Sequence, residues 1–259
     1  MIRRFFEDQK ILVVTGAVSF AGFLILAIVM LFDQTQILGI NRWIKPIKFF
    51  VSIAIYVWTI AVYFQYLPGW EAAKRRISIA MAVIFAVEQI AVVGQAARGT
   101  TSHFNVGNPF DGTVYAIMGA AIVINTILAG VLAWKYFTVR MDLPRPIVIG
   151  LQLGLVLFLL GSIEGAYMAA QTGHTVGGAD GGPGLPLVNW STVAGDLRVA
   201  HFLGMHGLQA APIVAWLINK VQPKLATPTV IAFSIIYALF VGFLFVEALN
   251  GRPFLTRLF

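Results

Sequence analysis

The stretch GDLRVAHFLGMHGLQAAP, residues 195 to 212, places an arginine, two histidines and a glutamine in an otherwise apolar run. At about 100° per residue these side chains share one arc of roughly 140° on a helix. Imidazole binds metals and moves protons, and arginine holds anions. The pattern predicts a chemically active helix face with Arg198 as a catalytic residue, Gln209 as a cofactor-binding residue, and His201 and His206 as metal ligands.

The two remaining histidines, His103 and His174, lie in polar, glycine-containing segments at 98–112 and 171–196. Long loops on a membrane scaffold are often functional lids, so we expect these two to bring both histidines to the site. His201 and His206 diverge by about 140°, so one ion held by either needs ligands from elsewhere. A mixed imidazole and carboxylate site suits iron, copper or zinc. Alternatively, one histidine is the axial ligand of a haem.

Glutamates inside apolar runs are the second class of candidate. Burying an ionisable group at membrane depth costs at least about 2.5 kcal/mol, and such groups are by default paired and functional. Glu88 and Glu164 are therefore predicted as catalytic bases or ligands. Basic and amide side chains nearby are predicted to bind a cofactor or an anionic group: Lys45, Lys48, Gln95 and Arg98. The alternative is that these groups simply pair with one another.

The elements that must position these residues are apolar runs of about 20 residues, the length that crosses a bilayer. The 259-residue chain is 59% hydrophobic and 11% charged, unlike a soluble domain. Continuous runs of this length predict helices rather than barrel strands. We expect an all-α polytopic membrane protein, one seven-helix domain over residues 1–259, with helices at about 11–32, 43–66, 77–97, 113–137, 146–170, 197–219 and 228–249.

Two helix faces stand out within these runs. The 146–170 run contains Gly150, Gly154, Gly161 and Gly165 within about 60°, which predicts close approach of a neighbouring helix beside Glu164. The 43–66 run carries a polar stripe within about 80° that we expect to face the protein interior or a water-filled path. It consists of Lys45, Lys48, Ser52, Tyr56, Thr59 and Tyr63. Asn108 and Asp196 are predicted helix N-caps.

Charge sets the predicted orientation. With the N-terminus inside, eleven lysines and arginines fall on the inner side and seven on the outer side, whereas four acidic residues are inner and seven outer. The positive-inside rule therefore predicts a cytoplasmic N-terminus and an outer C-terminus, and it accounts for the net charge of +7 without a nucleic-acid partner. The absence of cysteine excludes disulfides and thiolate ligands.

The stretches NRWIKPIKFF, QAARGTTSHFN, GHTVGGADGGPGLPLVNWS and GDLRVAHFLGMHGLQ resemble segments of an uncharacterised family of bacterial multi-pass membrane proteins. The resemblance spans most of the chain. It implies a multi-pass protein of the bacterial inner membrane, and it implies no activity.

Three functions fit the pattern. The first is a metal-binding or haem-binding membrane protein, with an outward-facing site and redox or related chemistry on a small anionic or lipophilic substrate. The second is a proton-coupled transporter or channel that uses the polar stripe of 43–66. The third is an accessory or sensor subunit of a membrane complex or homo-oligomer, with the polar cluster as a structural network. Whether the protein is an enzyme is left open by the sequence.

Overall fold

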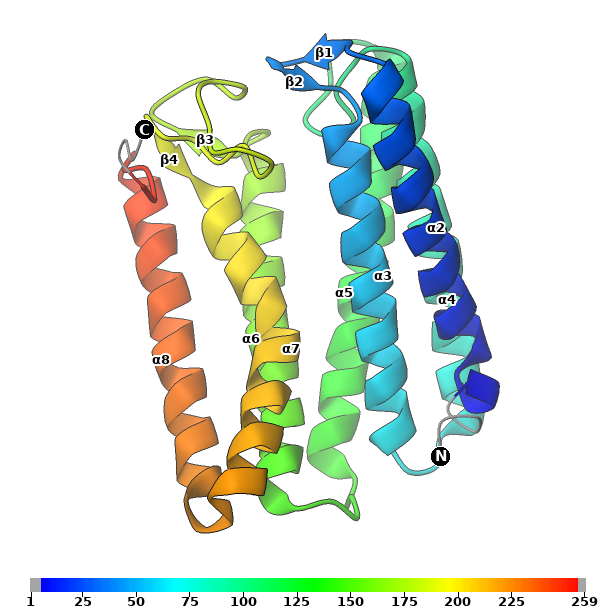
Figure 1. Cartoon of the computed structure of the whole chain (residues 1–259), viewed down its shortest axis with the longest axis vertical. Coiled ribbons are helices and arrows are strands. Elements are labelled where there is room, and N and C mark those ends of the chain that lie inside the picture. The colour runs from blue at the N-terminus through cyan, green and yellow to red at the C-terminus, as the bar shows by residue number, and fades with distance from the viewer. Residues whose placement is uncertain (1–5, 256–259) are drawn as a thin grey trace. The chain divides into compact units, whose positions relative to one another are not determined.

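The computed structural model describes residues 6–255, and this part of the chain is mostly helical. The long helices are α2 (Lys10–Phe32), α3 (Ile44–Tyr66), α4 (Glu71–Ala97), α5 (Pro109–Thr138), α6 (Arg145–Ala170), α7 (Leu197–Val221) and α8 (Pro223–Leu249) (Figure 1). Two antiparallel hairpins pair β1 (Gln36–Ile37) with β2 (Ile40–Asn41) and β3 (Thr175–Val176) with β4 (Gly195–Asp196). The all-α prediction is confirmed.

Six of these helices, all except α7, are long and apolar enough to cross a membrane. Their outward surfaces remain strongly apolar, since Ile90 is 73% exposed, and Leu31 and Leu239 are each 69% exposed. Such surfaces are stable against lipid chains and unstable against water. The described residues thus fit a multi-pass membrane protein, whereas a seventh span through α7 and the direction of insertion remain predictions.

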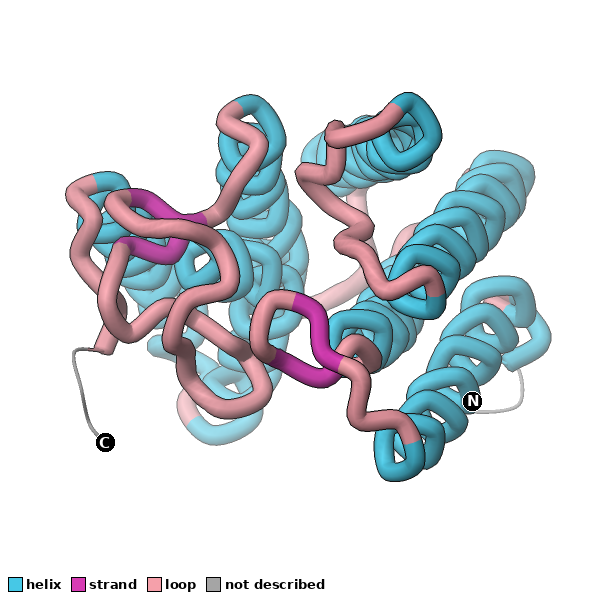
Figure 2. Tube along the Cα trace, turned by 90° about the horizontal axis from the view of Figure 1, so that it is seen from above, coloured by secondary structure: helices cyan, strands magenta, loops and turns pink. Residues whose placement is uncertain are grey.

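Contacts divide the chain into two compact units, Met1–Leu128 and Ala129–Phe259, with the boundary inside α5. The first unit contains α2, α3, α4 and the β1–β2 hairpin, and the second contains α6, α7, α8 and the β3–β4 hairpin. In each unit the hairpin and the longer loops cover one end of the helices (Figure 2). The prediction of a single seven-helix domain remains a prediction, and the units are described separately.

In the first unit, α2 and α3 are held close by large aromatic side chains of α3 that fill glycine positions of α2. A Cβ atom at Gly16 would lie 2.2 Å from the Trp58 ring, and one at Gly22 would lie 2.1 Å from the Phe50 ring. The Trp58 Nε1 atom also donates to the Val13 carbonyl at 3.2 Å. Any larger residue at either glycine would displace an aromatic ring.

In the second unit, glycines bring the backbones of α6 and α7 together, as the sequence predicts. A Cβ atom at Gly161 would lie 2.6 Å from backbone atoms of Gly204 and Met205. Toward the other end, a Cβ at Gly150 would lie 3.0 Å from the Ala211 carbonyl oxygen and 3.1 Å from Pro212 Cα. The α7 helix packs against both α6 and α8.

Both predicted N-caps are confirmed. Asn108 directly precedes α5, which begins at Pro109, and its Oδ1 atom accepts from the Asp111 backbone N–H at 2.9 Å. The Asp196 Oδ1 atom accepts from the Arg198 backbone N–H at 3.0 Å at the start of α7. Each cap satisfies a backbone donor that the helix itself leaves unpaired.

Candidate functional site

The predicted site residues divide equally between the two units. The first unit contains Lys45, Lys48, Glu88, Gln95, Arg98 and His103. The second contains Glu164, His174, Arg198, His201, His206 and Gln209. A single chamber shared by all of them therefore remains a prediction, and each unit is considered for the chemistry of its own residues.

His201 lies between α6 and α7 at the glycine contact. Its Nδ1 atom is 2.7 Å from the Gly161 carbonyl oxygen, and a Cβ atom at Gly165 would lie 2.8 Å from its ring. A carbonyl oxygen only accepts, so Nδ1 carries the proton of this hydrogen bond. The neutral ring then presents a lone pair at Nε2, which can take a proton or ligate a metal.

His206 is held in the same way but on the exposed side of α7. Its Nδ1 atom bonds the Phe202 carbonyl oxygen one turn earlier at 2.7 Å, and its ring lies 4.1 Å from the Phe202 ring. The lone pair of the neutral His206 ring is again at Nε2. Gln209, one turn beyond Met205, is only partly buried.

Glu164 lies on α6 between Gly161 and Gly165, the two glycines nearest His201. Its side chain is buried, at 9% exposure, and its Oε2 atom has no hydrogen-bond partner among the described residues. Glycines on both sides of Glu164 allow α7 to approach. One oxygen of the carboxylate is therefore enclosed by protein and has no hydrogen-bond partner there.

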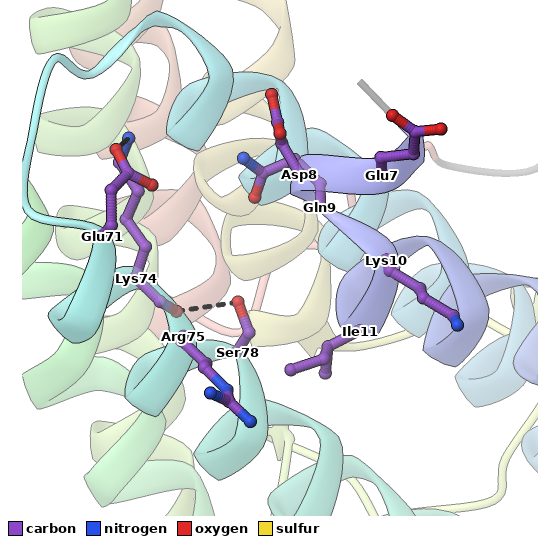
Figure 3. A pocket seen from close by; sticks show the side chains of 9 residues that line it. All are labelled: Glu7, Asp8, Gln9, Lys10, Ile11, Glu71, Lys74, Arg75 and Ser78. Atoms are coloured by element: carbon purple, nitrogen blue, oxygen red, sulfur yellow. Dashed lines mark hydrogen bonds and ion pairs between the residues drawn. The ribbon is translucent and has the colours of Figure 1, made fainter. Parts of the chain in front are cut away.

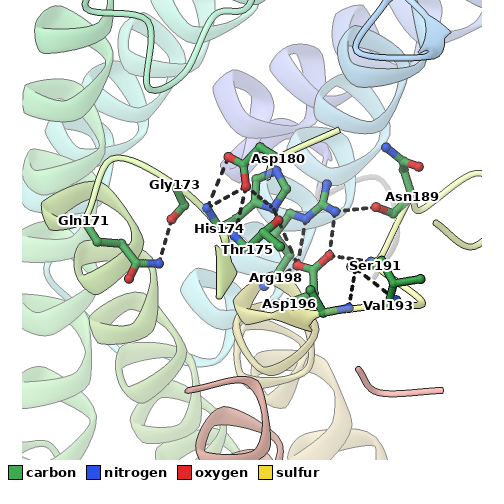
Figure 4. A network of polar contacts seen from close by, with 11 residues as sticks. Gln171, Gly173, His174, Thr175, Asp180, Asn189, Ser191, Val193, Asp196 and Arg198 are labelled. Carbon is green, nitrogen blue, oxygen red and sulfur yellow. Dashed lines mark hydrogen bonds and ion pairs between the residues drawn. The ribbon is translucent and has the colours of Figure 1, made fainter. Parts of the chain in front are cut away.

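Arg198 and His174 belong to a network in the loop between α6 and α7 (Figure 4). The Arg198 guanidinium bonds both carboxylate oxygens of Asp196, with Nε to Oδ1 at 2.9 Å and Nη2 to Oδ2 at 2.6 Å, and also bonds the Asn189 carbonyl. The His174 Nδ1 atom lies 3.3 Å from Asp180 Oδ1 and 3.8 Å from Asp196 Oδ1. Arg198 is thus engaged in holding the loop.

Electrostatics reinforce this network. Burial by itself would raise the pKa of the Asp196 carboxyl, but hydrogen bonds from Arg198 and Ser191, with the charges of Arg198 and His174, hold it below its ordinary value. The Ser191 backbone N–H donates to Asp196 Oδ2 at 2.8 Å. Asp196 is therefore an ionised anchor at neutral pH. Sequence reasoning identified it as a cap and missed the ion pair, although the Asp-x-Arg spacing was a usable signal.

In the first unit, Glu88 is the most enclosed of the predicted groups. It is 1% exposed on α4, and both of its carboxylate oxygens have no hydrogen-bond partner among the described residues. The positive charge of Lys45 on α3 acts on it electrostatically. The half-buried Lys45 and Lys48 stand at the start of α3, and farther along the same helix the Tyr56 hydroxyl donates to Asn125 Oδ1 at 3.3 Å.

Gln95 and Arg98 are brought together by Asp111, a residue that sequence reasoning missed as a site residue. The Asp111 Oδ1 atom accepts from Gln95 Nε2 at 2.8 Å and from the Arg98 guanidinium, which also bonds Gln95 Oε1. Asp111 and Gln95 are buried, at 4% and 2% exposure. This arrangement fastens the end of α4 to the start of α5.

His103 lies among aromatic rings beyond the end of α4. Its ring centroid is 5.4 Å from that of Phe49 and 6.1 Å from those of Phe104 and Tyr115, and its Nδ1 atom is 3.1 Å from the Ser102 hydroxyl. The His103 ring thus packs against three aromatic side chains, and its role as a metal ligand remains a prediction.

A second ion pair that sequence reasoning missed closes the β1–β2 hairpin. The Arg42 Nε atom donates to Asp33 Oδ2 at 2.7 Å, and Trp43 Nε1 donates to the same oxygen at 2.8 Å. Hydrogen bonds from Thr35, Trp43 and Arg42 hold the pKa of Asp33 well below its usual range. The sequence does contain a signal for this pair, because Asp33 ends one apolar run and Arg42 and Trp43 precede the next.

Each of the four histidines forms its own set of contacts. Within residues 6–255, no group of three or more histidine, aspartate or glutamate side chains is arranged to hold a metal ion. The metal and haem prediction gains no support from the ligand geometry and remains a prediction. Comparison of the chain with protein-family models, curated proteins and solved structures finds no match.

Proposed function

We propose that the protein is a proton-coupled membrane transporter in which Glu88 and Glu164 bind and release the coupled proton. The observation behind this proposal is that both carboxylates lie within helices apolar enough to span a membrane, yet neither is fully hydrogen-bonded by the described residues. A bare carboxylate is too costly in such surroundings. Each group is stable only when it carries a proton or meets a cation or a hydrogen-bond donor from outside.

Neighbouring groups support this proposal in each unit. The positive charge of Lys45 acts on Glu88, and His201 presents Nε2 at the helix contact that also includes Glu164. Carboxylates and imidazoles in membrane helices are the usual groups of proton relays. Two sites that each alternate between a protonated and an ionised form could couple proton binding to movement of a solute.

The direct test is proton uptake by vesicles that contain the purified protein and a pH-sensitive dye. Under an imposed membrane potential the wild type should take up protons. The variants Glu88→Gln and Glu164→Gln should not, because a glutamine side chain does not bind and release a proton as a carboxylate does. Glu247→Gln is the matched control, since Glu247 lies near the end of α8 in a surface pair with Arg252 at 2.9 Å. Wild-type vesicles no faster than empty ones would refute the proposal.

A chemical test adds an independent readout. Lipid-soluble carbodiimides react with protonated carboxyl groups, so they should modify Glu88 and Glu164 and leave Glu247 unmodified. Peptide mass spectrometry measures this directly. Absence of modification at both buried glutamates would contradict their assignment as proton-binding groups.

The bonding of His201 and His206 favours a second candidate, a haem or metal ion ligated by Nε2. Metal-ligating histidines usually donate their other N–H to a carbonyl or carboxylate, as both Nδ1 atoms do here. One absorbance spectrum and an elemental analysis of the purified protein test this candidate. A Soret band or stoichiometric metal that is lost in His201→Ala or His206→Ala would favour it over proton-coupled transport.

A further inference from the structure

A polar cavity of about 380 Å³ lies in the first unit, between the start of α2 and the start of α4 (Figure 3). Its volume is within the range of about 300–1,000 Å³ usual for small-molecule sites. Eight of its nine lining residues are polar or charged, and Ile11 is the exception. Because α2 and α4 are both apolar enough to span a membrane, the cavity opens where their apolar surfaces end.

Buried polar groups form the floor of this cavity. Gln9 is 5% exposed, and its side chain does not cap α2. Lys74 is 7% exposed, and its ammonium donates to the Leu67 carbonyl at 2.6 Å and to Glu71 Oε1 at 3.0 Å. An ammonium has three donors, so one remains for a ligand. These buried groups offer a ligand a positive charge and an amide.

Charges at the rim are ordered by depth. On α4, Glu71 precedes Arg75 by four residues, so Arg75 lies about 6 Å farther along the helix toward its apolar span. Before α2, Glu7 and Asp8 likewise precede Lys10. Figure 3 shows the three carboxylates spread across the upper part of the view and the side chains of Lys10 and Arg75 lower down. On each wall a carboxylate thus precedes a basic side chain that lies nearer the apolar span, whereas the Lys74 ammonium lies beside Glu71.

We propose that this cavity binds the headgroup of a phospholipid that carries both a phosphate and a primary ammonium, as in phosphatidylethanolamine. In such a lipid the phosphate adjoins the glycerol and acyl chains, and the ammonium is outermost. That order matches Lys10 and Arg75 for the phosphate, with Asp8 and Glu71 for the ammonium. Three acidic and three basic residues line the cavity, which fits a zwitterion better than an anionic lipid.

The test is native mass spectrometry of the full chain in detergent, titrated with phosphatidylethanolamine, phosphatidylcholine and phosphatidylglycerol of identical acyl chains. The wild type should retain phosphatidylethanolamine preferentially. Either Arg75→Gln or Lys10→Gln should weaken its retention about tenfold, the effect of losing one charge-assisted hydrogen bond. Arg76→Gln is the matched control, because this neighbour has the same charge, is exposed and does not line the cavity.

Selectivity separates headgroup recognition from a general loss of stability. Asp8→Asn should reduce the preference for phosphatidylethanolamine over phosphatidylcholine, whose quaternary ammonium cannot donate a hydrogen bond, and should leave phosphatidylglycerol binding unchanged. Equal retention of all three lipids, or an equal effect of Arg76→Gln and Arg75→Gln, would overturn the proposal. So would displacement of the lipid by millimolar inorganic phosphate, which would identify a free-phosphate site.

Discussion

The contact between α6 and α7 gives a sharp prediction for the variant Gly161→Ala. The new Cβ atom would lie 2.6 Å from the Gly204 carbonyl carbon and the Met205 nitrogen. These are backbone atoms and cannot rotate away, so the helices must separate by nearly 1 Å to restore ordinary contact distances. Overpacking of this kind costs about 1–3 kcal/mol. Separation also stretches the bond between His201 Nδ1 and the Gly161 carbonyl, worth about 1 kcal/mol.

An opposing effect must be subtracted. Alanine is a better helix former than glycine by up to about 1 kcal/mol. The net expectation for Gly161→Ala is a loss of about 1–3 kcal/mol in the free energy of unfolding. Gly242→Ala is the control, since a Cβ atom at Gly242 on α8 has no other atom within 4 Å among those considered. That variant should be unchanged or more stable by up to about 1 kcal/mol.

Both variants can be compared in detergent by the denaturant dependence of helical circular dichroism and by thermal melting. A Gly161→Ala protein as stable as Gly242→Ala would refute the proposed backbone contact. Gly204→Ala provides a second measurement of the same contact, because its Cβ atom would lie 2.7 Å from Gly161 Cα. Gly161→Ala and Gly204→Ala should both lower the free energy of unfolding.

The remaining predictions concern Asp196 and the two histidines of α7. Asp196→Asn should destabilise the loop 171–196 by up to about 3 kcal/mol, because it leaves Arg198 without its ionised partner, and limited proteolysis should cut the loop faster. Folding lowers the pKa of Asp196. The ionised carboxylate therefore contributes its full stabilisation above the unfolded-state pKa of about 3.9, and this stabilisation is lost as the pH falls through the lower folded-state pKa. The melting temperature of the wild type should thus fall in acid in a way that the variant does not show. His201→Ala should lower the melting temperature clearly, because it removes a hydrogen bond between α7 and α6. His206→Ala removes only an exposed hydrogen bond within α7 and should change the free energy of unfolding by less than about 0.5 kcal/mol. Equal effects of the two variants would contradict the placement of His201 between helices.

Helix positions were largely predictable because the physical requirement for crossing lipid is simple. The observed α3, Ile44–Tyr66, and α6, Arg145–Ala170, differ from the predicted runs by one residue at most. The larger differences occur at helix starts. α4 begins at Glu71 rather than at residue 77, and α8 begins at Pro223 rather than at residue 228, because an apolar run marks the lipid-facing length and the helix continues through polar turns.

The candidate site was less predictable for a different reason. Periodicity shows which side chains share a face of one helix, but it does not show which other helix that face meets. Arg198 was expected to serve chemistry and instead bonds Asp196 in its own loop, and Arg98 similarly bonds Asp111. The burial of Glu88 and Glu164, by contrast, followed from the high cost of leaving a carboxylate in lipid.

The polarity of α7 has a consequence for how the protein is made. A segment that is less apolar than the other six long helices has a weak tendency to enter the bilayer by itself during synthesis. The α6 helix leaves the ribosome first, so its glycine surface is available for α7 to pack against before α8 is made. If α7 spans the membrane as the sequence predicts, we expect its insertion to be cooperative, so that truncation after α7 or bulky residues on the α6 glycines should misdirect the nascent chain.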